Sequence, residues 1–288
     1  MELGRVGVWW SGTWRGADGS PGAAATEMES LGYRALWSSG GLEPGFPDRF
    51  GRLLAGTEQV PVASGILSIW HATPAQAAEG AAGLEATHPG RFLLGLGASH
   101  APIVEQLGTP YARPYSRMVR YLDALDDLGP TVAADRRVLA ALGPRMLTLA
   151  AERAAGAHPY FVPVEHIARA RDLLGPGPLL APELAVVLEP DPVVARARAR
   201  RYTTGYLGLA NYANNLATLG FGDDLEGGGT DKLVDAVVAW GDTAAIAERV
   251  RAFHDAGADH VCVQVVADRS DGFPIDAYRQ LAPALLAG

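Results

Sequence analysis

The chain has 288 residues, of which 48% are apolar and 19% are charged, and its formal net charge is -8. Its single cysteine can form neither an internal disulfide nor a structural zinc site, which excludes a secreted disulfide scaffold. An acidic chain without a basic cluster is not expected to bind nucleic acid, and no apolar run reaches the roughly 20 residues that a membrane helix needs. We therefore expect a soluble cytoplasmic protein with neither nucleic-acid nor membrane partners.

Short, continuous apolar runs recur along the chain, and each is followed by an amphipathic or alanine-rich stretch. Such runs are typical of strands buried on both faces, as in a parallel sheet covered by helices. The eight predicted strands comprise residues 6–10, 35–38, 60–69, 92–96, 138–142, 157–162, 179–188 and 260–266. The eight predicted helices comprise residues 22–31, 48–57, 74–87, 115–128, 144–155, 164–174, 242–256 and 275–286. Eight strand–helix units favour a (β/α)8 TIM-like barrel of the α/β class, folded as a single domain over residues 1–288.

Residues 190–240 interrupt this alternation. The segment is too long for one connection between neighbouring units, and we interpret it as a helical insertion after strand seven. It contains an arginine run formed by Arg196, Arg198, Arg200 and Arg201. Such a run is typical of a solvated helix face, with an anionic ligand or an oligomer contact as the alternative.

The active site of such a barrel lies at the carboxyl ends of its strands. The predicted strand ends carry aromatic, hydroxyl and imidazole side chains, and Glu189 is the only carboxylate near one of them. This composition disfavours metal-dependent hydrolysis and glycoside hydrolysis, and the only lysine, Lys232, lies in the insertion. An apolar mouth suits a planar aromatic cofactor instead. The residues expected to contact a substrate are Trp9, Trp37, Ser38 and Trp70.

Two local patterns predict contacts with an anionic, planar ligand. The glycines of residues 94–99 permit close backbone approach, with Ser99 and His100 as donors, although a tight turn explains the same glycines equally well. Gly143, Pro144 and Arg145 combine the N-terminus of a helix with a guanidinium, which suits a phosphate; an ordinary helix start with a surface arginine is the alternative.

Two histidines are candidates for proton transfer, because imidazole titrates near neutral pH. His100 is the first candidate and His71 the second. A structural hydrogen-bonding role is the alternative for each. Since no cluster of metal-ligating residues is apparent at the strand ends, we expect no metal site.

Four stretches of the chain resemble the bacterial luciferase-like superfamily of flavin and deazaflavin enzymes. They read GRFLLGLGASH at 90–100, VLAALGPRML at 138–147, GAHPYF at 156–161 and AGADHV at 256–261. The second and third favour an actinobacterial subgroup of coenzyme F420-dependent oxidoreductases. The resemblance implies a TIM-like barrel with an insertion after strand seven, a homodimer, and a deazaflavin lying across the strand ends.

The resemblance also implies a set of cofactor contacts. A cis peptide bond between Gly65 and Ile66 is expected behind the deazaflavin ring. The contacts that it implies are Gly65, Ile66, Ala98, Ser99, His100, Ala141, Leu142, Gly143, Pro144, Arg145, Gly156 and Ala157.

One departure from the family pattern bears on the reaction. Deazaflavin-dependent alcohol and sugar dehydrogenases of this superfamily carry an acidic residue and a histidine at the end of strand two, where this chain has Ser39 and Gly40. Hydride transfer between C5 of coenzyme F420 and a small organic substrate is the leading hypothesis. Substrate reduction is the less demanding direction, because it needs only a hydride donor and a proton source, and the sequence does not fix the direction. An FMN-dependent luciferase-like monooxygenase and a noncatalytic cofactor-binding paralogue are the alternatives.

Overall fold

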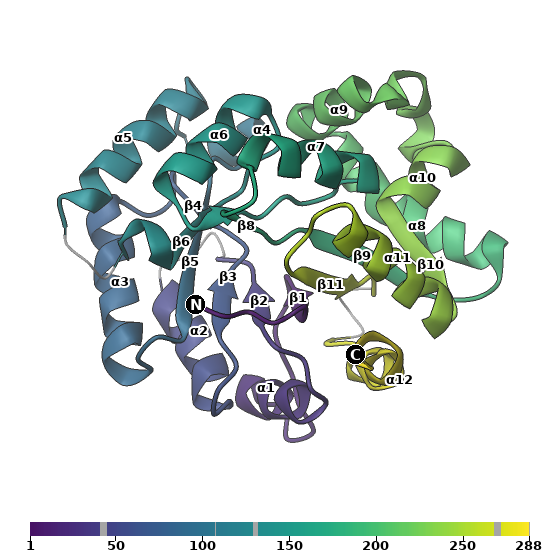
Figure 1. Cartoon of the computed structure of the whole chain (residues 1–288), viewed down its shortest axis with the longest axis horizontal. Coiled ribbons are helices and arrows are strands. Elements are labelled where there is room, and N and C mark those ends of the chain that lie inside the picture. Colours follow the sequence, from purple (N-terminus) through teal and green to yellow (C-terminus); the bar gives the residue numbers. More distant parts are fainter. Residues whose placement is uncertain (41–44, 107, 129–131, 268–271, 288) are drawn as a thin grey trace.

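The computed structural model describes residues 1–40, 45–106, 108–128, 132–267 and 272–287. Parallel strands form its centre, and helices surround them (Figure 1). The strands are β1 (Val6–Trp10), β2 (Leu36–Ser38), β3 (Val62–Ser64), β4 (Leu67–Ser68), β5 (Phe92–Gly97), β6 (Arg137–Leu139), β7 (Gly156–Ala157), β8 (Leu179–Leu180), β9 (Glu183–Leu188), β10 (Val238–Gly241) and β11 (Val261–Val265). They pair in the order β10-β9-β11-β1-β2-β3-β5-β6-β7-β8, and β4 pairs with β5.

The two ends of this path are joined through the chain, because only Ala181 and Pro182 separate β8 from β9. The N–H of Ala181 donates to the carbonyl of Ala157 at 2.9 Å, and the N–H of Glu183 donates to that of Pro159 at 2.9 Å. These bonds extend the ladder between β7 and β8 into β9. The sheet therefore closes into a TIM-like barrel, which confirms the predicted fold class.

The helices follow the predicted pattern, and α4 is an additional short one. They are α1 (Pro21–Ser30), α2 (Phe46–Ala55), α3 (Pro74–Thr87), α4 (Ala101–Glu105), α5 (Pro114–Asp126), α6 (Pro144–Arg153), α7 (Val164–Leu174), α8 (Pro192–Leu207), α9 (Ala210–Leu216), α10 (Asp231–Val237), α11 (Thr243–Asp255) and α12 (Ile275–Leu285). Side-chain caps fix several starts: Thr73 and Gln76 form a capping box on α3, and Asp242 accepts from the N–H of Ala245 on α11. Among the described residues, no helix has the length and apolar character required to cross a membrane.

Four predicted strands differ from the observed ones, and one of them, residues 179–188, is divided into β8 and β9. Predicted strand three is divided into β3 and β4 at Gly65 and Ile66, and the peptide bond between these two residues is cis, as the resemblance implies. The prediction of strand five was wrong beyond Leu139, and β6 ends there. Predicted strand six was wrong beyond Ala157, because Phe161 has a φ of 56°, in the left-handed region that a strand cannot contain.

The insertion comprises α8, α9 and α10 and forms a separate apolar cluster against the barrel, with Tyr212, Leu216 and Leu233 among its buried members. The predicted helical character is correct for most of it. Its last residues are a strand, however, since β10 pairs with β9 in parallel from Val238 onward. The sequence prediction missed this strand.

Arg137 is a fully buried cation at the start of β6, with 1% of its surface exposed. Its guanidinium donates to the carbonyls of Arg153 and Val132, each at 2.9 Å, and to Oδ1 of Asp126 at 2.6 Å. These bonds join α5, α6 and β6 at the amino end of the barrel wall.

We predict that Arg137→Leu lowers the free energy of unfolding by about 3 kcal/mol, because it leaves the carbonyls of Val132 and Arg153 without this donor and leaves Asp126 with Arg153 as its remaining ion-pair partner. Urea denaturation measures the change. The matched control is Arg136→Leu, which removes a partly exposed arginine whose contact with Glu85 is 3.5 Å and should cost less than about 1 kcal/mol. Equal losses for the two variants would contradict this role.

Candidate functional site

The carboxyl ends of three neighbouring strand units meet at Gly97. Ser68 pairs with Gly97, and Leu96 pairs with Leu139, so the ends of β4, β5 and β6 lie side by side. A Cβ atom on Gly97 would lie 2.5 Å from Cδ1 of Ile66 and 3.2 Å from Cβ of Ala140. The predicted cofactor contacts at 65–66, 98–100 and 141–145 are therefore brought to one edge of the barrel.

The loop after β5 is held by the insertion. Ser99 has a φ of 56°, in the left-handed region that is uncommon for residues other than glycine. The Nδ1 atom of His100 lies 2.8 Å from Oδ1 of Asn211 in α9, and its ring centroid lies 5.1 Å from that of Tyr212. Burial lowers the pKa of His100, and the hydrogen bond to Asn211 opposes this only partly, so the imidazole is neutral at pH 7.

Trp70 and His71 follow β4 and differ in how they are held. Trp70 donates from Nε1 to the carbonyl of Ala98 at 2.7 Å, and the guanidinium of Arg117 lies 4.0 Å from its ring centroid. His71 has no hydrogen-bond partner for either ring nitrogen among the described residues, and burial lowers its pKa. Trp70 is thus a fixed wall beside the end of β5, whereas both ring nitrogens of His71 are buried and unsatisfied by any described residue.

The N-terminus of α6 is open. Gly143 is its N-cap residue and provides no side-chain cap, and a Cβ atom on Gly143 would meet no other atom within 4 Å. Pro144 begins the helix, and the guanidinium of Arg145 lies 4.0 Å from the ring centroid of Tyr115 in α5. An uncapped helix N-terminus with free space in front of it suits an anion, such as the phosphate of a flavin or deazaflavin.

The remaining predicted cofactor contacts are less exposed than Gly143 at the start of α6. Ala141 is buried behind this helix start, and Leu142 is partly buried. Gly156 and Ala157 form β7 inside the barrel wall, where Ala157 pairs with Leu139 and both residues are buried. The structure therefore does not bring Gly156 and Ala157 to the open side of α6.

The predicted substrate contacts divide into two groups. Trp37 is fully buried inside the barrel, where its ring stacks on His158 at 4.3 Å and its Nε1 donates to Nε2 of His260 at 3.1 Å. Ser38 is also fully buried, and its hydroxyl accepts from Nε1 of Trp14 at 3.3 Å. These two residues contribute no exposed surface, so the strand ends leave Trp9 and Trp70 as the aromatic candidates.

Trp9 lies directly below the division between β3 and β4. A Cβ atom on Gly65 would clash with Nε1 of Trp9 and would lie 3.1 Å from Nε2 of His158. Both nitrogens are buried without a hydrogen-bond partner among the described residues. Glycine is therefore required at position 65, and the backbone there covers two unsatisfied polar atoms.

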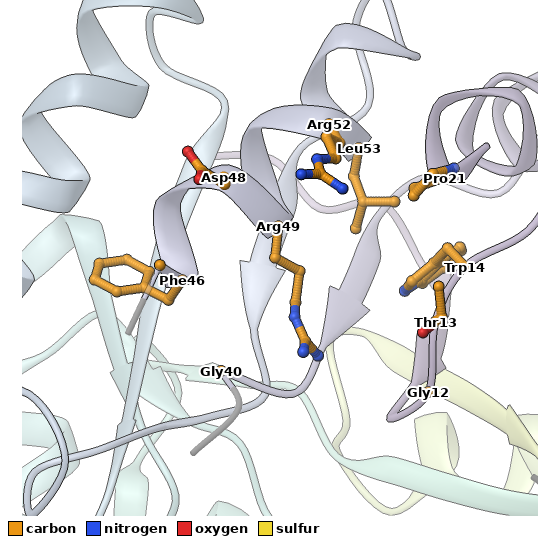
Figure 2. A pocket seen from close by; sticks show the side chains of 11 residues that line it. Gly12, Thr13, Trp14, Pro21, Gly40, Phe46, Asp48, Arg49, Arg52 and Leu53 are labelled. Atoms are coloured by element: carbon orange, nitrogen blue, oxygen red, sulfur yellow. The ribbon is translucent and has the colours of Figure 1, made fainter. Parts of the chain in front are cut away.

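A pocket of about 320 Å³ opens at the carboxyl ends of β1 and β2 (Figure 2). The loop after β1 lines it at Thr13 and Trp14, and α2 contributes Arg49 and Arg52. None of the site residues predicted from the sequence lines it. Gly40 borders the pocket, and a Cβ atom there would lie 2.7 Å from the carbonyl oxygen of Ile66. Packing against the end of strand three thus excludes a side chain at this position.

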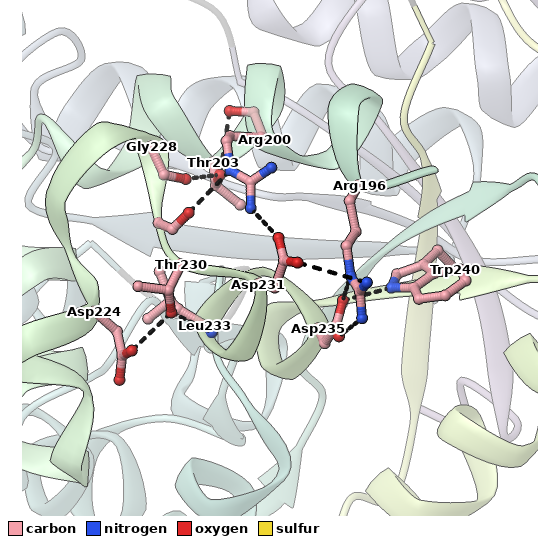
Figure 3. Close-up of polar contacts among 11 residues, drawn as sticks. Arg196, Arg200, Thr203, Asp224, Gly228, Thr230, Asp231, Leu233, Asp235 and Trp240 are labelled. Carbon is pink, nitrogen blue, oxygen red and sulfur yellow. Dashed lines mark hydrogen bonds and ion pairs between the residues drawn. The ribbon is translucent and has the colours of Figure 1, made fainter. Parts of the chain in front are cut away.

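The arginine run of the insertion is used mainly within the protein (Figure 3). Arg196 of α8 contacts both carboxylate oxygens of Asp235 in α10, at 2.9 and 2.5 Å. Arg200 pairs with Asp231 and donates to the carbonyl of Gly229 at 2.9 Å. These pairs join α8 to α10, and Arg198 lies 3.8 Å from Glu189, so three of the four arginines pair with carboxylates of the protein.

Sequence reasoning missed one ionisable residue, Glu183, which begins β9 and is 1% exposed. Burial raises the pKa of its carboxyl to about 8, against the lowering effect of hydrogen bonds from the Phe161 N–H and the Tyr202 hydroxyl. The signal was present, because glutamate is almost never fully buried unless it is paired. Among the described residues, no group of three His, Cys, Asp or Glu side chains is arranged to hold a metal ion.

The strand-end loops of this closed parallel barrel meet beside an open helix N-terminus, at the face where proteins of the α/β-barrel class carry their sites. The family model described as luciferase-like monooxygenase matches residues 19–137 and 129–260. The chain belongs to this family. No curated protein matches it.

Solved structures with this fold use different cofactors. A secondary alcohol dehydrogenase that depends on F420, in complex with an F420–acetone adduct, is 15% identical, with 99% of each chain covered and a TM-score of 0.74. The coenzyme F420-dependent tetrahydromethanopterin reductase from Methanopyrus kandleri is 13% identical, with 100% of this chain and 99% of that chain covered and a TM-score of 0.74. The oxygenating constituent of 3,6-diketocamphane monooxygenase from Pseudomonas putida, in complex with FMN, is 14% identical, with coverages of 98% and 96% and a TM-score of 0.67. At these identities the likeness establishes the fold.

The buried ionisable groups of the barrel predict how stability depends on pH. Burial lowers the pKa of His158, His166 and His260 from 6.5 to about 4, so the unfolded chain binds more protons than the folded one between those values, and stability rises with pH there. Glu183 acts in the opposite direction, because its pKa rises from 4.5 to about 8 and the folded state holds the additional proton. We expect the free energy of unfolding to be greatest near pH 6.5 and to fall by about 2 kcal/mol by pH 8.

Urea denaturation at a series of pH values measures this profile. Glu183→Gln should remove the fall between pH 6.5 and 8 and leave the rise below pH 6.5. The exposed Glu58→Gln serves as the control and should retain both slopes. A fall above pH 6.5 that persists in Glu183→Gln would contradict the assignment.

Proposed function

We propose that the protein is a coenzyme F420-dependent oxidoreductase that transfers a hydride between C5 of the deazaflavin and a small organic substrate. The observation that carries the proposal is the meeting of three strand ends at Gly97 beside the open N-terminus of α6. This arrangement offers a flat backbone surface for a ring system and an anion site for its phosphate. Two of the structures with the same fold contain or depend on F420.

The residues present fit such a cofactor. The strand-three backbone at Gly65 and Ile66 would support the ring, with Trp9 beneath it. Residues 98–100 would border the ring, while Gly143 and Arg145 would hold the phosphate. The bound deazaflavin would supply the hydride chemistry, and the protein would orient a substrate against Trp70 and exclude water. The homodimer that the resemblance implies remains a prediction.

The roles of the two histidines follow from their protonation state. Burial lowers the pKa of both His100 and His71, so each imidazole is neutral at pH 7. A neutral imidazole accepts a proton more readily than it donates one. Both side chains therefore suit substrate oxidation as bases, whereas substrate reduction requires a proton from another group or from water.

Cofactor titration tests the proposal. We expect the purified protein to bind F420, and Arg145→Ala to weaken this binding about tenfold through loss of one charge-assisted contact with phosphate. Arg120→Ala, which removes an exposed arginine of the neighbouring helix α5, is the matched control and should bind as the wild type does. Quenching of tryptophan fluorescence reports binding, and a panel of activated enones, quinones and ketones tests the oxidation of reduced F420.

The second candidate is an FMN-dependent monooxygenase, which is supported by the family itself and by the FMN-bound structure with the same fold. FMN also carries a phosphate, so the open end of α6 suits both cofactors. Tight binding of FMN without affinity for F420 would replace the first candidate with the second. Loss of affinity in Arg120→Ala but not in Arg145→Ala would show that the phosphate lies elsewhere.

A further inference from the structure

The barrel contains a buried acid to which the hydride transfer assigns no role. Glu183 has no ion pair among the described residues, although it is 1% exposed. Its Oε2 atom accepts from the N–H of Phe161 at 3.2 Å, and its Oε1 atom lies 3.4 Å from the hydroxyl of Tyr202 in α8. A buried carboxyl with so few partners is expected to remain protonated.

A chain of hydroxyls begins at this acid. The Tyr202 hydroxyl donates to that of Tyr160 at 3.1 Å. The Tyr160 hydroxyl in turn donates to Oε1 of Gln264 in β11 at 2.7 Å and lies 2.7 Å from the Tyr206 hydroxyl. The Tyr202 hydroxyl carries one proton and lies within reach of two acceptors, Oε1 of Glu183 and the Tyr160 hydroxyl. When the Glu183 carboxyl is protonated and donates to Tyr202, the Tyr202 proton goes to Tyr160, and the hydrogen bonds then run in one direction from Glu183 to Tyr160.

The chain ends next to the site. Tyr160 is partly exposed, in contrast to Glu183, and its ring centroid lies 5.1 Å from that of Trp9. Trp9 is the side chain that lies against Gly65, where the proposed function places the cofactor ring. Tyr160 is thus the member of the chain closest to the reacting atoms.

The groups around Glu183 are uncharged at neutral pH. Burial raises the pKa of Tyr160, Tyr202 and Tyr212 well above the ordinary value, and it does the same for Cys262 in β11 and for Tyr278 in α12. Burial lowers the pKa of His158 to about 4, which makes this imidazole neutral as well. Within the described part of the chain, no neighbouring cation offsets the cost of ionising the carboxyl, in agreement with a pKa of about 8.

We propose that Glu183, Tyr202 and Tyr160 form an internal relay that supplies the proton accompanying hydride transfer. The inference rests on the proposed function. The bound deazaflavin would supply the hydride, and thus two electrons, and the substrate anion that results would need one proton. The Tyr160 O–H bond breaks to protonate that anion, Tyr202 returns a proton to Tyr160, and Glu183 returns one to Tyr202. The Glu183 carboxylate then regains a proton from solvent, and oxidation of the substrate runs the same steps in reverse.

The first test uses the cofactor-free protein, because a protonated carboxyl gives an infrared C=O stretching band that a carboxylate lacks. We expect such a band at pH 7, its loss near pH 8, its absence in Glu183→Gln and a frequency shift in Tyr202→Phe. Binding of F420 should also shift the band in the wild type and in Tyr206→Phe, whose hydroxyl lies outside the relay, but not in Tyr160→Phe. An ionised Glu183 at pH 7 would overturn the relay, as would a band that F420 leaves unchanged.

The second test measures turnover of reduced F420 with whichever acceptor of the panel is reduced. Glu183→Gln and Tyr160→Phe should each lower kcat at least about tenfold with KM unchanged, and Glu183→Gln should lose the decline of kcat above pH 8. Tyr206→Phe should stay within about twofold of the wild type. If both relay variants keep the kcat and the pH profile of the wild type, the relay is wrong and the proposed function stands. If the protein does not bind F420, or turns over none of the acceptors, the proposed function is wrong together with the relay.

Discussion

Closure of the parallel barrel is the constraint on which the candidate site depends. The ladder that runs from β7 through β8 into β9 joins the two ends of the strand path at Ala181 and Pro182. In a closed parallel barrel all carboxyl ends of the strands lie on one face, so loops that are far apart in the chain become neighbours. Gly97 at the end of β5 is an example, because it lies close to Ile66, between β3 and β4, and to Ala140, directly after β6.

The closed interior also determines the protonation of the groups inside it. Desolvation lowers the pKa of His158 and His260 to about 4 and raises that of Glu183 to about 8. These opposite shifts have one cause, because a low-dielectric interior favours the neutral form of every group. His158 therefore stacks on Trp37 as an uncharged ring and His260 accepts a hydrogen bond from it, while the glutamate keeps a proton. The pH dependence of stability and the protonation of Glu183 at neutral pH thus both result from burial in the barrel interior.

The sequence predicts the barrel well because each buried strand leaves a continuous apolar run. It predicts single side chains less well, since a run does not specify which side of the strand a residue occupies. Trp37 and Ser38 were expected at the mouth for this reason, yet both are buried. The apolar run 157–162 concealed the left-handed residue Phe161, and the run 179–188 concealed Glu183. Pairing of β10 with β9 depends on tertiary contacts that no local pattern records.

At the end of predicted strand two this chain has Ser39 and Gly40, where related dehydrogenases carry an acidic residue and a histidine. This difference makes the insertion a candidate source of the groups that the proposed proton transfer needs. Gly40 lies against the backbone of Ile66, so no side chain can occupy the position at which related dehydrogenases carry a base. Under the proposed function a proton has to come from other elements, and α8 and α9 place Tyr202 and Asn211 beside Glu183 and His100. The ion pairs between α8 and α10 hold α8 in place through two carboxylates on α10. In the proposed function the insertion would therefore complete the site from outside the barrel, because α8, which carries Tyr202, is joined to α10 by these ion pairs.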